Sequence, residues 1–322
     1  MSERPEPWPV LVHKDLEPMV DYVNRVAQVA GKYTLDEPFE VGWGNIVLEV
    51  TPRGLRTPTF RHPDVTFSVH YRLLDGDVLI ETDKGSRSLP LDAESVAAFY
   101  AAYCETAAEL GISRPRSSLI CEIPDAPPTF EADTAKRTWD PDAARRIWQA
   151  MNLAAAGLEA WQAPFLGHRP RVGVMWGGFD LSATRFRAQH TAPPPQRPPF
   201  MQNAQLNAYV SVGFSFDNTR FNNADAPEIG MYAYIWPQPD GLEGRSWGVE
   251  GANWYPEAGL ALLPWDNLRR LPDPHRAIVK FGEAVYDAAV QTAGWPPDLF
   301  GPRVDGWYAS RTPWEVLERH DG

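Results

Sequence analysis

Apolar residues recur along this chain either every three to four positions, as in amphipathic helices, or at alternate positions, as in strands. Each half of the chain shows these patterns in the same order. In the first half, an amphipathic helix is predicted over residues 15–31, with Gly31 as its end. Residues 65–73 alternate apolar and polar side chains and predict a half-buried strand, and Asp75-Gly76 predicts a tight hairpin turn. A Leu-Pro pair then leads into a second helix, with Asp92 as its N-cap and Gly111 as its end.

The second half repeats this order. Asp140 as N-cap and Pro141 at the first helical position predict a helix within residues 139–162, and strands are predicted over 207–216 and 229–236. Another Leu-Pro pair precedes a helix over 274–293 that Gly294 ends. This half is longer, and we expect the extra residues in loops at 188–205, 217–228 and 237–257.

One stretch occurs twice, as "VGWGNIVLEVT" (41–51) and as "VMWGGFDLSAT" (174–184). Five of the eleven positions are identical, so we expect a Trp-Gly strand to open each half. The predicted fold is therefore α+β and internally duplicated, each half being helix, antiparallel strands and helix, related by a pseudo-twofold axis. The predicted division is a first repeat at 1–121, a Pro-rich linker at 122–139, a second repeat at 140–300 and a C-terminal tail at 301–322.

The amino-acid composition argues against two classes of binding partner. The net charge of −12 and the scattered arginines argue against nucleic acid and anionic membranes as partners. No apolar run is long enough to span a bilayer and the first ten residues lack a signal-peptide core, so a soluble cytoplasmic protein is expected. The many Ala and Pro residues and few Lys residues are typical of a bacterial source. The sequence leaves the oligomeric state open.

Motifs for the common cofactors are missing. No Cys-x-x-Cys, His-x-His or His-x-x-x-His occurs, so no metal site is expected, and the two cysteines are interpreted as structural thiols. Gly-x-Gly-x-x-Gly, the P-loop and Gly-x-Ser-x-Gly are also absent. We therefore expect no cofactor.

Four stretches resemble an uncharacterised, mostly bacterial family catalogued as a domain of unknown function. They are "LPLDAESVAAFYAA" (89–102), "DPDAARRIW" (140–148), "WGGFDLSATRFR" (176–187) and "LLPWDNLRR" (262–270). The resemblance covers nearly the whole chain and implies no activity. It does imply a His-Glu before Gly-Phe-Trp in the segment after the Pro-rich loop, whereas this chain has "NAYVSVGFSF" (207–216). No metal or acid–base role is therefore expected for that segment.

The strand period places an acidic residue beside each repeated tryptophan. Asp180 shares a face with Trp176, and Glu49 shares a face with Trp43. In a cleft between the halves, Asp180 or Glu49 would act as general acid or base, with the two tryptophans as walls. On a solvated sheet surface both acids would be structural, and this alternative stays open.

Further polar residues flank these strands. Arg185, Arg187 and His190 follow the second Trp-Gly strand, and Arg185 would clamp an anionic ligand or else form a structural ion pair. His70, on the polar face of the next strand, is a third catalytic candidate if it meets Glu49. The glycine- and tryptophan-rich segment 236–256 is either a lid over a ligand or a loop anchored by its aromatic rings.

Two classes of function remain. One is a small-molecule enzyme with a cleft between the repeated halves, and the other is a non-catalytic ligand-binding or scaffolding protein. An enzyme would bring Asp180 and Arg185 into one cavity, whereas a scaffold would hold them in structural contacts.

Overall fold

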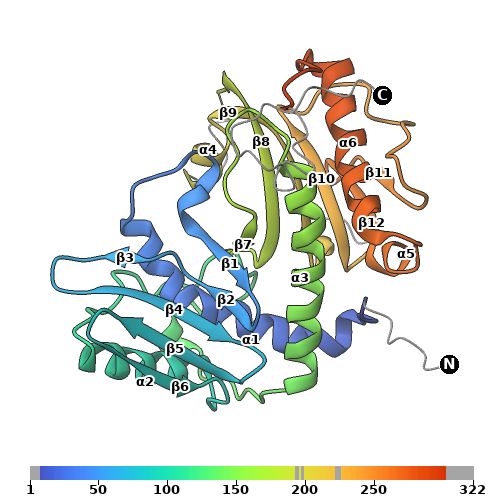
Figure 1. The fold of residues 1–322 in the computed structure, drawn as a ribbon. Helices are drawn as coiled ribbons and strands as arrows, with labels where there is room; N and C mark the ends of the chain where they lie inside the picture. Colours follow the sequence, from blue (N-terminus) through green and yellow to red (C-terminus); the bar gives the residue numbers. More distant parts are fainter. Residues whose placement is uncertain (1–7, 193–195, 197–198, 222–225, 302–322) are drawn as a thin grey trace, which may run out of the picture.

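The computed structural model describes residues 8–192, 196, 199–221 and 226–301. Within these residues, twelve strands form one antiparallel sheet, with the order β11-β12-β10-β9-β8-β7-β1-β2-β4-β5-β6 and β3 beside β4 (Figure 1). The strands are β1 Val47–Thr51, β2 Gly54–Arg56, β3 Phe60–Arg61, β4 Thr66–Arg72, β5 Asp77–Thr82, β6 Gly85–Pro90, β7 Gly173–Met175, β8 Asp180–His190, β9 Asn207–Ser215, β10 Gly230–Trp236, β11 Asn253–Tyr255 and β12 Leu260–Pro264. The α+β class predicted from the sequence is confirmed.

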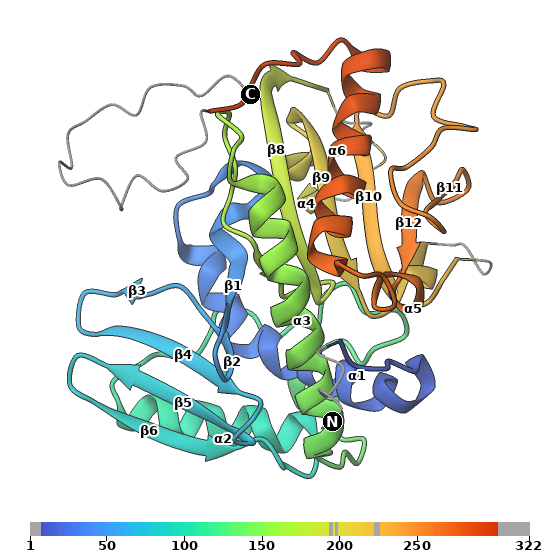
Figure 2. The same cartoon turned by 45° about the vertical axis from the view of Figure 1, so that its right-hand side comes forward.

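Helices cover the sheet in two groups. The α-helices are α1 His13–Gly31, α2 Val96–Glu109, α3 Pro141–Gln162, α4 Pro199–Ala204, α5 Trp265–Leu268 and α6 Pro274–Ala293, and the 3-10 helices are η1 Lys32–Asp36, η2 Val41–Ile46, η3 Phe130–Ala132 and η4 Asn218–Phe221. Helices α3 and α6 pack on each other and cover one face of β8, β9 and β10, whereas α2 lies behind β5 and β6 (Figures 1 and 2). Helix α1 contacts both α2 and α3.

The helix ends test the capping predictions. Asp140 caps α3 by accepting hydrogen bonds from the N–H groups of residues 142 and 143, and Gly294 ends α6 with φ +64°, as predicted. The predicted cap Asp92 is wrong, because α2 begins later and Ser95 Oγ accepts the capping bond from Ala98 N–H. Gly31 has a helical φ of −54°, so α1 does not end there through a left-handed glycine conformation. Its role is close packing, since a β-carbon there would lie 2.7 Å from Cγ of Trp176.

The two Trp-Gly pairs precede their strands and do not belong to them. Residues 41–46 form η2, and residues 176–179 form the turn between β7 and β8. The strand predicted from residue 41 therefore begins only at Val47, and the strand predicted from residue 174 is interrupted until Asp180. These two strand starts occupy matching positions in the repeated stretch.

Turn and loop predictions were partly met. The β4–β5 connection is longer than a two-residue hairpin turn, and only Gly76 in it has a positive φ, of +74°. Strand β11 and helices α4 and η4 lie inside segments predicted as loops. Residues 193–195, 197–198 and 222–225 of those segments, and residues 302–322 of the predicted tail, lie outside the described residues.

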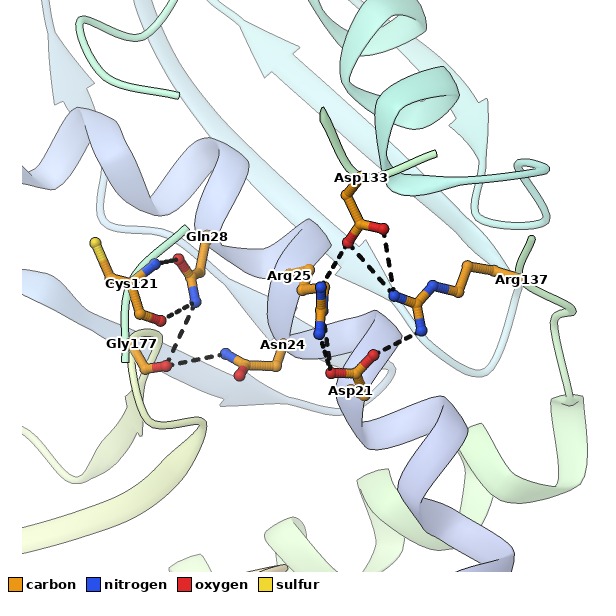
Figure 3. A network of polar contacts seen from close by, with 8 residues as sticks. All are labelled: Asp21, Asn24, Arg25, Gln28, Cys121, Asp133, Arg137 and Gly177. Atoms are coloured by element: carbon orange, nitrogen blue, oxygen red, sulfur yellow. Dashed lines mark hydrogen bonds and ion pairs between the residues drawn. The ribbon is translucent and has the colours of Figure 1, made fainter. Parts of the chain in front are cut away.

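The segment predicted as a linker, 122–139, packs firmly against α1. Phe130 and Asp133 are fully buried. Arg25 Nη1 on α1 donates to Asp133 (2.6 Å), and both Arg25 and Arg137 donate to Asp21 (2.7 and 2.6 Å, Figure 3). Two guanidinium and two carboxylate groups thus form a charge-balanced ring that fixes this segment to the helix.

Candidate functional site

The β7–β8 turn, residues 176–179, is held by side chains of α1. Asn24 Nδ2 donates to the carbonyl oxygens of Trp176 (2.7 Å) and Gly177 (3.2 Å), and Gln28 Nε2 also reaches the Gly177 carbonyl (3.4 Å, Figure 3). Phe179 closes the turn with φ +57°, and its N–H donates to the carbonyl of Met175. Because buried carbonyls need partners, these amide groups keep the turn in one conformation.

Gln28 also fixes the segment that carries Glu122. Its side-chain amide pairs with the peptide groups of Cys121, donating to the carbonyl and accepting from the N–H, both at 2.9 Å (Figure 3). Glu122 follows with φ +60°, a left-handed conformation that is costly for a residue with a β-carbon. One side chain of α1 therefore bridges two segments that are distant in the sequence.

This arrangement brings two carboxylates to one pair of glycines. A β-carbon at Gly177 would lie 2.6 Å from Cδ of Glu122. A β-carbon at Gly178 would lie 2.8 Å from Oδ1 of Asp180 and 3.8 Å from Oε2 of Glu122. Any side chain larger than hydrogen at these positions would push the carboxylates away, so both glycines are needed for their approach.

The surroundings of Glu122 favour its protonated form. Its side chain reaches solvent, yet protein atoms surround the carboxyl group over the glycine turn. This burial, together with the negative charge of Asp180, raises the pKa of Glu122 to about 7, while the Lys32 ammonium acts in the opposite direction. A carboxyl group with such a pKa exchanges its proton near neutral pH.

Asp180 is stabilised by a phenol. Tyr232 on β10 donates a hydrogen bond from its hydroxyl to Oδ2 of Asp180. Burial first, and then the charge of Asp180, raise the pKa of Tyr232 well above its usual value, so the phenol keeps its proton. The phenol lies across β9 at Gly213, where a β-carbon would collide with its ring.

Lys32 completes the group from the side of η1. It is buried, with its Nζ 3.0 Å from Sγ of Cys121 and 4.6 Å from the centre of the Trp176 ring. The site thus combines a lysine from the first half, Cys121 and Glu122 near the predicted linker, and Asp180 from the second half.

A cavity of about 250 Å³ adjoins the segment that carries Glu122. Ile123 and Pro124, which follow Glu122, line it together with Asp21 and Arg25 of α1. Phe216, another lining residue, stacks on Phe179 at a centroid distance of 6.5 Å. The cavity is close to the lower end of the size range of small-molecule pockets.

Comparison with known proteins identifies the family. A family model described as "Family of unknown function (DUF5996)" matches residues 8–301. The chain belongs to this family. The resemblance seen in the sequence motifs is thereby confirmed at the level of the family. No curated protein and no solved structure matches the chain.

Strand β8 contains most of the family-like stretch "WGGFDLSATRF", and its side chains point alternately to the two faces of the sheet. Two predicted site residues, Asp180 and Arg185, therefore lie on opposite faces. The register of β8 with β9 places Leu181, Ala183 and Arg185 on the face towards α3 and α6, and Asp180 on the opposite face. Arg185 is fully buried, donates to Glu283 of α6 (2.9 Å) and to the carbonyl of Trp161, and lies 4.1 Å from the Trp161 ring. The predicted shared cleft of Asp180 and Arg185 is therefore wrong, because strand alternation points them apart.

The other predicted ligand-binding residues are held in structural contacts or lie at the surface. Trp176 is buried and its indole N–H donates to Thr34 Oγ1 (3.1 Å), so it forms no open wall. Trp43 is half-buried and its ring meets that of Phe39 edge to face. Arg187 donates to the Ala293 carbonyl (2.9 Å), and His190 is exposed at the end of β8.

Glu49 and His70 are not brought together. Strand β2 separates their strands, so Glu49 pairs with Arg56, which in turn lies opposite His70. Glu49 forms ion pairs with Arg56 and Arg171, and His70 contacts Ser68 and Glu81. Burial is the main reason that the pKa of His70 is lowered, so its imidazole is neutral near pH 7. The predicted His70–Glu49 pair is wrong.

Sequence patterns missed Glu122, Lys32 and Tyr232. Glu122 lies in the Pro-rich segment predicted as a linker, Lys32 directly follows a predicted helix, and Tyr232 lies in a predicted strand without a motif. The Gly177-Gly178 pair was the available signal, because adjacent glycines often mark a close approach to the backbone. Among the described residues, no group of three or more His, Cys, Asp or Glu is placed to hold a metal ion, and no helix is long and apolar enough to cross a membrane.

Proposed function

We propose that this protein is an enzyme that acts on a small molecule by general acid–base catalysis at the Glu122–Asp180 pair. The observation that carries the proposal is the approach of these two carboxylates to Gly178 from distant parts of the chain. Their surroundings differ, since Asp180 accepts a hydrogen bond from Tyr232 whereas Glu122 has a raised pKa of about 7. A carboxyl group with a raised pKa beside a second, differently hydrogen-bonded carboxyl group is a recurrent arrangement for general acid–base catalysis.

In this scheme Glu122 donates a proton to a substrate heteroatom, and Asp180 lies beside it with its Oδ2 held by the hydrogen bond from Tyr232. Because Glu122 reaches solvent, a substrate has access to its carboxyl group from that side. The left-handed backbone of Glu122 and the clamp by Gln28 hold the acid in place, which favours catalysis by positioning. The expectation of an anionic substrate depended on Arg185 and is not carried over.

Gene duplication remains part of the proposal. Strands β1 and β8 start at matching positions of the repeated stretch, and they lie on either side of β7 in the sheet. Strands β2, β4, β5 and β6 extend the sheet beyond β1, and β9, β10, β12 and β11 extend it beyond β8. A site at the junction of two related halves would explain why Lys32, Glu122 and Asp180 come from different segments.

A non-catalytic scaffold is the second candidate. The contacts of Trp176 and Arg185 support it, because both side chains join elements of the core and neither faces an open site. In that case the carboxylates would have no substrate, and their removal would change only stability.

Incubation with a bacterial metabolite extract, followed by mass spectrometry, distinguishes the two candidates. The variants are Glu122→Gln and Asp180→Asn, with Glu105→Gln, an exposed glutamate on α2, as the matched control. The proposal predicts that the wild type and the control consume a metabolite and that both site variants lose at least about 99% of this rate while remaining folded. No consumption by the wild type, or equal consumption by all four proteins, would contradict it.

A further inference from the structure

The β10–β11 loop, residues 237–252, is fastened to α6 and shapes a second cavity. Gly248 has φ +75°, and a β-carbon there would lie 2.7 Å from the Lys280 carbonyl of α6. Arg245 donates from Nη1 to Oε1 of Gln291 on α6 and from Nε to the carbonyl of Gly241, both at 2.7 Å. These contacts favour a fixed loop and argue against the lid considered for this segment.

Two stacked indoles form one wall of this cavity. Trp247 is buried and Trp254 on β11 is half-buried, with ring centroids 5.6 Å apart and planes inclined by 24°. Stacking on a buried ring fixes the orientation of Trp254, so little conformational entropy is lost when a ligand packs against it.

The cavity has a volume of about 330 Å³, within the range of small-ligand pockets. Besides the indoles, its lining includes the carboxylate of Glu243, the guanidinium of Arg245 and the amide of Asn253. Glu243 and Asn253 are exposed, so their polar groups are open to a ligand from solvent. The lining therefore offers both hydrogen-bond donors and acceptors beside an aromatic wall.

One buried polar atom of a lining residue lacks a partner. The indole Nε1 of Trp247 is buried and has no hydrogen-bond acceptor among the described residues. Leaving such a donor unsatisfied costs about 1–3 kcal/mol. Because this N–H is closed to solvent, Trp247 contributes its ring and not a hydrogen bond to the cavity.

We propose that this cavity binds a neutral sugar ring. The C–H groups on one face of a pyranose pack against an indole, and its hydroxyls, which both donate and accept, match the mixture of carboxylate, guanidinium and amide groups. The Glu243 carboxylate and the net charge of −12 disfavour phosphorylated ligands. This site is separate from the carboxylate pair and does not depend on the function proposed for it.

The test uses the full chain with a panel of free hexoses, N-acetylhexosamines and their disaccharides, measured by ligand-observed NMR and titration calorimetry. At least one sugar should bind with a Kd of about 1 mM or tighter. Trp254→Ala should weaken that binding at least about tenfold, and Glu243→Gln several-fold. Trp139→Ala, which removes another half-buried tryptophan far along the chain, should leave the Kd unchanged.

Glu243→Gln keeps the test decisive if Trp254→Ala fails to fold, because Glu243 is exposed. Three results would overturn the proposal. They are no binding of any sugar at about 10 mM, equal affinities of the wild type and both cavity variants, or saturable binding of nucleosides without binding of sugars.

Discussion

At the scale of single residues, glycines leave the space in which polar side chains of the site approach the backbone. Gly177 and Gly178 let Glu122 and Asp180 approach one turn, and Gly213 lets the Tyr232 phenol lie across β9. The chemistry of the site therefore depends on residues that have no side chain.

The pKa of Glu122 gives the first prediction. The fold raises the pKa of Glu122 from 4.5 to about 7 and therefore favours its protonated form. The contribution of this group to stability is complete below pH about 4 and is lost as the pH rises through about 7. Glu122→Gln should remove this loss, which is on the order of 1 kcal/mol because water screens an exposed group. Urea unfolding below pH about 4 and above pH about 8 measures it. Glu105→Gln keeps Glu122 and should therefore show the same pH-dependent loss of stability as the wild type, and an equal loss in Glu122→Gln would contradict the raised pKa.

The second prediction concerns the bond between Tyr232 and Asp180. Gly213→Ala should destabilise the protein by about 1–3 kcal/mol or more, because the new methyl group collides with the phenol and with the Leu181 carbonyl oxygen. Tyr232→Phe, which removes only the hydroxyl, should cost about 1.5–3 kcal/mol in the wild type. In the Gly213→Ala background the same change should cost much less, since the hydroxyl has already been displaced. Additive losses in a double-mutant cycle would show that Gly213 does not position the phenol.

At the scale of elements, β8 makes two kinds of contact, because its successive side chains point to opposite faces of the sheet. One face carries Leu181, Ala183 and Arg185 against α3 and α6. The other face begins with Asp180 and continues with the hydroxyls of Ser182 and Thr184, both of which contact Ser211. A single strand thus joins the helical layer on one side to the candidate site on the other.

The third prediction tests the structural role of Arg185. Glu283→Gln should lower the free energy of unfolding by about 2–4 kcal/mol, because it leaves a buried guanidinium without its countercharge. Asp287→Asn, at an exposed position of the same helix, should change it by less than about 0.5 kcal/mol. If chemical denaturation gave the same stability for both variants, the ion pair would not be what holds Arg185, and a role in anion binding would regain support.

At the scale of the whole molecule, the two halves are joined in more than one way. The sheet runs through both by the pairing of β1 with β7, and α1 contacts α3. The ring of Arg25, Asp21, Arg137 and Asp133 fastens the connecting segment to α1 (Figure 3). Because Cys121 is bound to the same helix through Gln28, this packing also places Glu122.

The fourth prediction is that Asp133→Ala loosens this connection. The change removes a fully buried carboxylate and leaves two guanidinium groups only partly paired, so stability should fall by about 3–5 kcal/mol. Limited proteolysis should then cut within residues 113–128, which stay protected in the wild type. Glu94→Ala breaks the exposed pair with Lys136 and should cost less than about 1 kcal/mol. Equal protease resistance of the two variants would show that the ring does not hold the segment.

The sequence by itself determined the local elements and the family. Helix α3 with its Asp140 cap, α6 with its Gly294 end and the strands β4, β9 and β10 follow from short-range periodicity and capping, which act between neighbouring residues. The α+β class follows from the order of these elements.

Only the tertiary structure decided the candidate site. Sequence patterns placed Asp180 correctly on a polar strand face, but they paired it with Arg185, which points the other way, and they passed over Glu122 and Tyr232. These partners come from segments that are brought together by Gln28 and by the register of β8, β9 and β10. Contacts between distant segments depend on packing and strand order, and neither can be read from the spacing of residues along the chain.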